Sequence, residues 1–456
     1  MATPTAFALA IPDIILLILD QLLVFKPHDV VKSLAALACT SRAWHAPALA
    51  ALWRELPDPA PLRALMPPAD EAGRPEAWHA FDKHAGLVRS WGPDTRFLAY
   101  YLHQRAAMSQ QDLIPNPFPA LRSVGLQSDA PPGPASPEFK LPALRSAYVY
   151  FSYWSLPPSA TPWELMHFLA SAPQLTSLSL AGRVPLSALT QLANLEALHT
   201  LDLARAELPD DEAALLLLAG LDVRALVLPR IGWYDPDPSI VHAKGQSFAH
   251  LRHLSFPSCS PLQVASFLVH VVPDALQSLS ITSGPFPALF PSSNPYSSWA
   301  DLIENLPQTL RVLRLRTGPG EGVCLGAFAA LTSLETLDAD VCMSAVSASP
   351  QAASHAMKCV RLRLQGAGDV AMEPGDISTA KLACALHALW PSLERVIVMS
   401  PKESKADGGL ESEGVFGENG GADWKVEEGD FGGKENSRAW AGVEAAVRRL
   451  QATRAR

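Results

Sequence analysis

The chain has 456 residues, 48% of them hydrophobic, which is enough for several domains or for one repeat array with a large core. Its formal net charge of -9 argues against general binding to nucleic acids or anionic membranes. The six cysteines form no CxxC pair and no disulfide framework, which favours a reducing compartment, the cytoplasm or the nucleus.

Residues 11–56 form the first predicted unit, after a flexible N-terminus of residues 1–10. The segment IPDIILLILDQL predicts a helix that is apolar on all sides over residues 14–19, and more helix follows a short hinge. Asp20 interrupts the apolar run, which is too short to span a membrane, and residues 1–10 lack the basic residues of a signal peptide. We therefore expect another part of the chain or another protein to cover this helix.

Residues 57–86 look like a Pro-rich connector with a short helical stretch around Trp78. From residue 87 to residue 400 a short phrase recurs, with apolar residues at its first, fourth and sixth places. Examples are LRSVGL at 121, LRSAYV at 144, LRVLRL at 310, LETLDA at 334, CVRLRL at 359 and LERVIV at 393.

The spacing of these phrases predicts a repeat fold. From 121 onward they begin 23 to 34 residues apart, for example at Leu121 and Leu144, which brackets the leucine-rich-repeat period with insertions. Alternation inside each phrase indicates a strand, and stretches such as 209–220 between phrases indicate helices. The fold class is therefore α/β: a small helical N-terminal domain, then an irregular leucine-rich-repeat solenoid with a curved parallel sheet and helices on its convex side.

Two segments follow the repeats. Residues 401–437 are rich in Gly, Glu and Lys with few apolar residues, which predicts a disordered acidic insert. Residues 438–456 recover a helical pattern, and we expect this helix to cap the last repeat.

The first predicted unit resembles an F-box. Ile11 and Pro12 stand where that motif has a Leu-Pro-like pair, Asp13 follows, and the apolar run ends in Leu22. The second half of the motif matches at Leu37, Ala38, Cys39, Arg42, Trp44, Leu52, Trp53, Glu55 and Leu56. F-box proteins often carry leucine-rich repeats behind the motif, in the order found here.

This resemblance implies a substrate-recognition subunit of a Skp–cullin–F-box ubiquitin ligase. The F-box would bind a Skp-family adaptor, and through it a cullin–RING ligase, while the repeats hold an unknown protein target. The positions that the resemblance assigns to adaptor contact are Ile11, Pro12, Ile15, Leu16, Leu19, Leu22, Leu37 and Trp44. Two alternatives stay open: the helices are only a cap on the solenoid, or the chain is a repeat scaffold with no ubiquitin role.

Aromatic residues give one candidate for target binding. Tyr148 belongs to the strand phrase at 144 and should face the concave side, whereas Tyr150 and Trp154 should enter the next loop, and Trp233 lies in a later one. Tyrosine and tryptophan are typical anchors of protein interfaces. Packing of these rings over irregular loops is an equal alternative.

Charges in the last repeats give another candidate, at Arg314, Arg316 and Arg363. Acidic residues such as Asp338 and Asp340 occupy the neighbouring repeat, so a self-compensated ladder of ion pairs is the alternative to a charged target site. The ladder is the favoured interpretation, and Arg316 and Arg363 remain the candidates for outward contact.

No catalytic motif or metal-ligand pattern stands out, and His250 and His253 lack a third ligand nearby in the sequence. We therefore expect a non-catalytic protein with no cofactor and no metal.

Overall fold

The structure, a computed structural model, describes part of the chain. The described residues are 12–22, 27–56, 58, 60–68, 71, 74–92, 118–127, 141–151, 172–208, 211–229, 248–257, 259, 264, 267–268, 276–283, 302–303, 306–317, 323, 325–342, 356–365 and 377–399. The chain divides into two compact units, Met1–Leu221 and Asp222–Arg456. The predictions for residues 1–10, 401–437 and 438–456 lie outside the described residues.

The first unit begins with three helices: α2 (Pro12–Leu22), α3 (Pro27–Thr40) and α4 (Arg42–Arg54). Proline suits the first turn of a helix because that turn needs no backbone N–H donor, and two of the three helices begin with one. Asp13 in the first turn of α2 and Arg54 in the last turn of α4 each interact favourably with the dipole of their helix.

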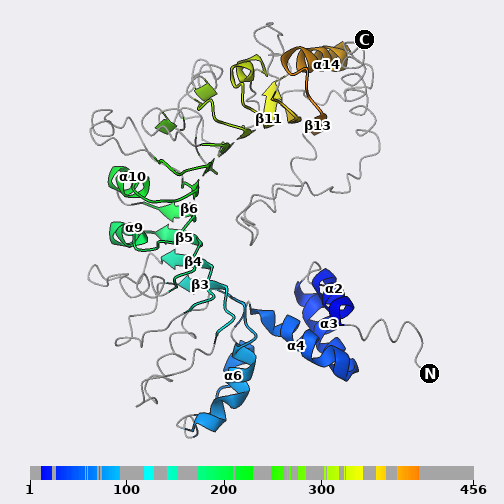
Figure 1. The fold of residues 1–456 in the computed structure, drawn as a ribbon, viewed down its shortest axis with the longest axis vertical. Coiled ribbons are helices and arrows are strands. Elements are labelled where there is room, and N and C mark those ends of the chain that lie inside the picture. Colours follow the sequence, from blue (N-terminus) through cyan, green and yellow to red (C-terminus); the bar gives the residue numbers. More distant parts are fainter. Residues whose placement is uncertain are drawn as a thin grey trace, which may run out of the picture. The chain divides into compact units, whose positions relative to one another are not determined.

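The helices lead directly into a parallel sheet, as Figure 1 shows. The strands of the first unit are β1 (Glu55–Leu56), β2 (Ser90–Trp91), β3 (Ser123–Gln127), β4 (Ser146–Phe151), β5 (Ser177–Arg183) and β6 (Thr200–Glu207). Each strand pairs in parallel with the next in chain order. The connections described in this unit carry α5 (Ala60–Arg63), η1 (Pro75–Trp78), α6 (His79–Ala85), α9 (Leu186–Leu192) and α10 (Asp211–Ala219).

Alternation of apolar residues builds the core of this sheet. In β4 the side chains of Ala147, Val149 and Phe151 are buried, whereas those between them face outward. Burying one such Val or Phe contributes about 1.5–3 kcal/mol, and neighbouring repeats share the buried layer. The helices α9 and α10 lie on one side of β5 and β6 in Figure 1.

Gly182 lets β4 and β5 stay close where β5 is irregular. Its φ angle is 75°, a left-handed conformation that favours glycine, and a Cβ at this position would overlap the backbone of Phe151. The register between β5 and β6 shifts between Ser179 and Ala181, just before this glycine.

The second unit has the same construction. Its strands are β7 (Ala225–Val227), β8 (His253–Phe256), β9 (Ser278–Thr282), β10 (Val312–Arg316), β11 (Thr336–Cys342), β12 (Cys359–Gln365) and β13 (Arg395–Met399), again parallel and in chain order. The described connections carry η2 (Leu325–Ala330) and α14 (Ile377–Leu389).

The structure confirms the predicted parallel sheet with helices, one strand to each leucine-rich-repeat-like unit. Two details of the prediction are wrong. The first strand is Glu55–Leu56, inside the segment predicted to be helical, and not after the connector. The repeat phrase predicted to begin at Cys359 is also shifted by two residues. Cys359 pairs with Thr336, the third residue of the preceding phrase, so the phrase begins at the buried Met357. Within the described residues, no helix combines the length and the apolar character that a bilayer crossing requires.

Candidate functional site

The three N-terminal helices pack around a small core of their own. Its buried members come from all three helices: Ile15, Leu19, Leu34, Ala38 and Ala48. Leu22, Leu37, Trp44, Leu49, Ala51 and Leu52 pack against them. The spacing of four residues in the pairs from α2 and α3 puts each pair on one helix face, which is why these residues meet.

The opposite side of α2 is apolar and exposed. Leu16 is 51% exposed and Leu17 is 65% exposed, and Val31 on α3 is 53% exposed. Ile14, Leu17, Ile18, Gln21 and Leu22 line a shallow hollow on this helix. A helix that is apolar on both sides keeps only one of them covered in this structure, so the other side is available to a partner. We call Ile14, Leu16, Leu17 and Ile18 the α2 patch.

The structure divides the predicted adaptor contacts into two groups. Ile15 and Leu19 are buried in the helix cluster, so they stabilise it and do not face a partner; Leu22, Leu37 and Trp44 pack against the same core. Of the predicted residues, Leu16 is exposed. Pro12 begins α2, and Ile11 lies outside the described residues.

Leu17 is also exposed on α2, although it is not among the predicted contacts. The spacing of Ile14, Leu17 and Ile18 at i, i+3 and i+4 could have identified this second apolar stripe.

The helix cluster is joined to the sheet without a linker. β1 follows α4 at the next residue, and the ring of Trp53 lies 4.7 Å from that of His84. The backbone N–H of Arg89 donates to the carbonyl oxygen of Arg54 at 2.9 Å. These contacts hold the last turn of α4 against the chain that enters β2.

Both predicted tyrosines lie on the outward face of β4, so the prediction that Tyr150 enters the loop is wrong. Tyr148 is half-buried, and Tyr150 is exposed. Tyr148 lies between Gly125 on β3 and Ser179 on β5, in register with both. Both neighbours of Tyr148 are small, and the exposed side chain of Tyr150 is accessible to a partner. Trp154 and Trp233 lie outside the described residues.

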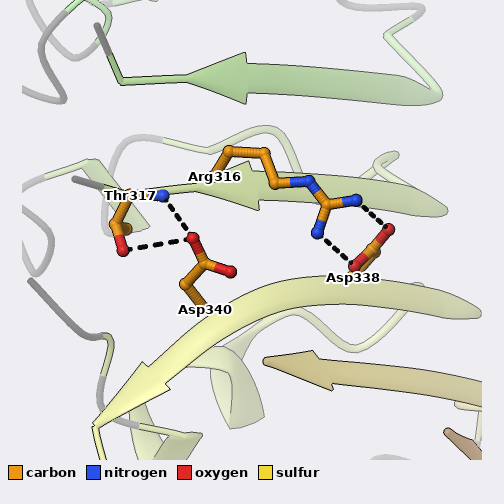
Figure 2. A network of polar contacts seen from close by, with 4 residues as sticks. All are labelled: Arg316, Thr317, Asp338 and Asp340. Carbon is orange, nitrogen blue, oxygen red and sulfur yellow. Dashed lines mark hydrogen bonds and ion pairs between the residues drawn. The ribbon is translucent and has the colours of Figure 1, made fainter. Parts of the chain in front are cut away.

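On β10 and β11 the charges compensate one another, as Figure 2 shows. Nη1 and Nη2 of Arg316 donate to the two carboxylate oxygens of Asp338, at 2.9 and 3.0 Å. The side chains are 18% and 6% exposed. A bidentate pair at this burial is a strong, directional contact.

Asp340 lies beside this pair on the same strand. Its Oδ2 accepts hydrogen bonds from the backbone N–H of Thr317 at 2.7 Å and from the Thr317 hydroxyl at 3.3 Å. Burial nevertheless raises the pKa of Asp340 above its ordinary value, because desolvation outweighs the Thr317 bonds and the charge of Arg316.

The predicted arginines therefore have different roles. Arg316 was expected to reach outward, but it is engaged by Asp338 across the sheet. The register places Arg361, and not Arg363, opposite Asp338, whereas Arg363 pairs along the backbone with Asp340. Arg314 lies opposite Asp338 on the other side and also has contacts of its own. The ladder alternative thus describes β10 and β11.

A second charged network lies just before these strands. Arg311 Nη1 is 3.7 Å from Glu335 Oε1, and Lys358 Nζ is 2.9 Å from Glu335 Oε2. These three residues occupy the same place in successive repeats, so positive, negative and positive side chains alternate along the edge of the sheet.

Two further groups have shifted pKa values. Burial lowers the pKa of His253, and the charge of Arg252 lowers it further, so the imidazole is neutral at neutral pH. Burial raises the pKa of the Cys359 thiol, which keeps it protonated and unreactive. Among the described residues, no group of three or more His, Cys, Asp or Glu side chains is placed to hold a metal ion.

Comparisons with known proteins give fold likenesses alone. No protein-family model matches the chain, and no curated protein matches it. The leucine-rich repeat-containing protein LegL7 from Legionella pneumophila is 17% identical with a TM-score of 0.37, over 57% of this chain and 85% of that one. An internalin, inlF, from Listeria monocytogenes is 14% identical with a TM-score of 0.32, over 76% of this chain and 92% of that one.

Proposed function

We propose that this chain is the substrate receptor of a Skp–cullin–F-box ubiquitin ligase. In this proposal the α2 patch binds a Skp-family adaptor, and the repeats hold a target protein. The observation that carries the proposal is the exposure of Leu16 and Leu17 on a helix whose other side is already buried.

The distribution of exposed apolar side chains supports a docking role. Among the described residues, the large exposed ones are Leu16, Leu17, Val31 and Tyr150, so three of the four lie on α2 and α3. Each leucine that moves from water into an interface contributes about 1.5–3 kcal/mol when fully buried. A partner that buries both leucines of α2 therefore gains binding free energy, which explains two exposed leucines on one helix.

The F-box resemblance of residues 11–56 names the partner. The contact set we propose is the α2 patch together with the exposed Val31 on α3. Ile15 and Leu19 act indirectly, because they hold α2 on the cluster.

The proposed mechanism is proximity and not catalysis by this chain. An adaptor at the helices and a target on the repeats raise the target's effective concentration at the ubiquitin-transferring enzyme. Such a receptor works in the cytoplasm or nucleus. The alternative is a repeat scaffold that binds a protein through the half-buried Tyr148 and the exposed Tyr150 of β4 and binds no adaptor.

The test uses two substitutions that leave the helix core untouched. Leu16→Asp together with Leu17→Asp puts charges where the adaptor would bury apolar surface, which opposes binding because a buried unpaired charge is costly. We expect affinity for a purified Skp-family adaptor, measured by calorimetry, to fall at least about a hundredfold. Tyr150→Asp is the matched control: it charges an exposed apolar residue on β4 and should leave adaptor affinity unchanged.

The melting temperature of each variant separates lost binding from lost folding. Leu16→Asp with Leu17→Asp should change the melting temperature by only a few degrees, since both leucine side chains are exposed. If the wild-type chain does not bind the adaptor, the ubiquitin role is wrong and the scaffold alternative stands. If the double variant binds equally well, the α2 patch is not the adaptor site.

A further inference from the structure

Three arginines stand in a row at one edge of the first unit's sheet. Arg89, Arg122 and Arg145 each come directly before a strand, β2, β3 and β4, and all three are exposed. The backbone N–H of Arg122 donates to the carbonyl oxygen of Arg89 at 2.7 Å, and that of Arg145 donates to Arg122 at 2.8 Å. Paired strands are about 4.8 Å apart, so these side chains leave the edge at intervals of about 5 Å. We call them the arginine row.

Within the described part of the chain, the charges of the arginine row are not compensated. No carboxylate of the described residues forms an ion pair with any of its three members. The turns that lead into β3 and β4, residues 118–121 and 141–144, read FPAL and LPAL and are neutral. Like charges on neighbouring strands repel one another, so the fold carries this arrangement at a cost.

The second unit shows that this repeat position can be compensated. There the equivalent residues Arg311, Glu335 and Lys358 alternate in sign and form ion pairs. The repeat type therefore permits compensation at this position but does not require it, because Arg224 and Arg252 in the second unit are also exposed neighbours of the same sign.

Hydroxyl groups accompany the arginines. Ser90, Ser123 and Ser146 each follow one of them and lie in register on β2, β3 and β4. All three are half-buried. The edge thus offers guanidinium and hydroxyl donors side by side, the groups that bind carboxylates and phosphates.

We propose that the arginine row binds a short acidic segment of a partner protein, with carboxylate or phosphate groups about 5 Å apart. Three successive strands span about 10 Å, which matches about three or four extended peptide residues. Nucleic acid fits less well, because stable binding to it uses many phosphate contacts and the chain carries a net charge of -9. The inference that the row binds the target of the ligase rests on the proposed function. The inference that it binds an acidic peptide does not depend on adaptor binding.

The test measures fluorescence anisotropy of labelled peptides on the full chain at low salt. One peptide carries four consecutive glutamates, and a second carries two phosphoserines in place of two of them. Arg122→Gln with Arg145→Gln should weaken binding of both peptides about tenfold, since each exposed charge pair contributes about twofold to fivefold. Arg311→Gln with Lys358→Gln is the matched control: it removes the same charge at the same repeat position and should change affinity less than twofold.

Conservative variants separate the two anion sources. Arg122→Lys with Arg145→Lys keeps the charge but loses the bidentate guanidinium, so it should weaken the phosphopeptide more than the glutamate peptide if phosphate is the natural ligand. Equal affinity of the lysine variant for both peptides would assign the row to carboxylates.

Three results would overturn the inference. They are no binding of either peptide by the wild type, an equal loss in the control variant, or tighter binding of an RNA oligonucleotide of the same charge. The chain with Leu16→Asp and Leu17→Asp should bind both peptides as the wild type does. Peptide binding therefore tests the arginine row even if the adaptor proposal fails.

Discussion

Two stretches of the sheet edge, one in each unit, carry charges at the same repeat position but differ in how those charges are compensated. In the second unit Arg311, Glu335 and Lys358 alternate in sign and lie within ion-pair distance of one another. In the first unit Arg89 and Arg122 stand on neighbouring strands with the same sign. The difference teaches that a charged stripe on a repeat protein has to be judged by its partners: compensated charges hold repeats together, and uncompensated ones are available to another molecule.

The largest expected effect is a loss of stability when the buried ion pair between Arg316 and Asp338 is broken. In Asp338→Ala the guanidinium of Arg316, 18% exposed, loses both carboxylate oxygens and stays largely desolvated. We expect the free energy of unfolding to fall by about 3 kcal/mol, since removing one partner of a buried pair leaves an uncompensated charge. Urea denaturation measures it. Arg122→Ala, in the uncompensated row, should cost less than about 0.5 kcal/mol; equal losses at the two sites would erase the contrast.

A smaller effect concerns acidity in the compensated region. The pKa of Asp340 is raised in the folded chain, so folding favours its protonated form. Its contribution to stability is present below the ordinary value of 3.8 and is lost as the pH rises through the raised pKa. The amide of Asp340→Asn does not titrate and still accepts the bond from Thr317.

The difference in unfolding free energy between wild type and Asp340→Asn should therefore shift against the wild type as pH rises above 3.8, then level off. Chemical denaturation at several pH values measures this difference. A constant difference across that range would mean that the carboxyl group keeps its ordinary pKa in the folded chain.

The smallest expected effect is also the sharpest test of the comparison, because its sign changes between the units. Arg122→Gln should raise the free energy of unfolding by about 0.3 kcal/mol at low salt, since it relieves repulsion between neighbouring strands. Arg311→Gln should lower it by about 0.5 kcal/mol, since it removes an ion pair with Glu335. Both changes should shrink in 0.5 M salt. The same sign at both positions would contradict the assignment of the two edges.

Much of the fold could be predicted from the sequence because the repeat phrase carries its own geometry. Alternation marks the strands, and burial of Leu313 and Leu315 in β10 follows that alternation directly. The phrase near Cys359 misled the prediction because Met357 and Cys359 are both apolar enough to occupy its first place. The pairing of Cys359 with Thr336, a long-range fact, decides between them.

The candidate sites were less predictable, for two physical reasons. A helix that is apolar all round gives no sign of which side packs inward, and only the positions of Leu34 and Ala48 on other helices select Ile15 and Leu19. In the backbone register of β10 and β11, Arg314 lies opposite Asp338. The ion pair with Asp338 is nevertheless made by Arg316, the next residue on the same face of β10. A long side chain reaches that neighbour, and the sequence pattern does not show which neighbour it takes.

The direct passage from α4 into β1 has a mechanical meaning. Glu55 continues from the helix in an extended conformation, and the hydrogen bond from Arg89 to Arg54 ties this corner to the next repeat. The corner has no flexible joint, so a molecule held on the α2 patch cannot swivel freely about the strands that follow. An inserted Gly-Ser segment between Arg54 and Glu55 would act as a swivel: each surface would keep its affinity, while the fixed bearing between two bound molecules would be lost.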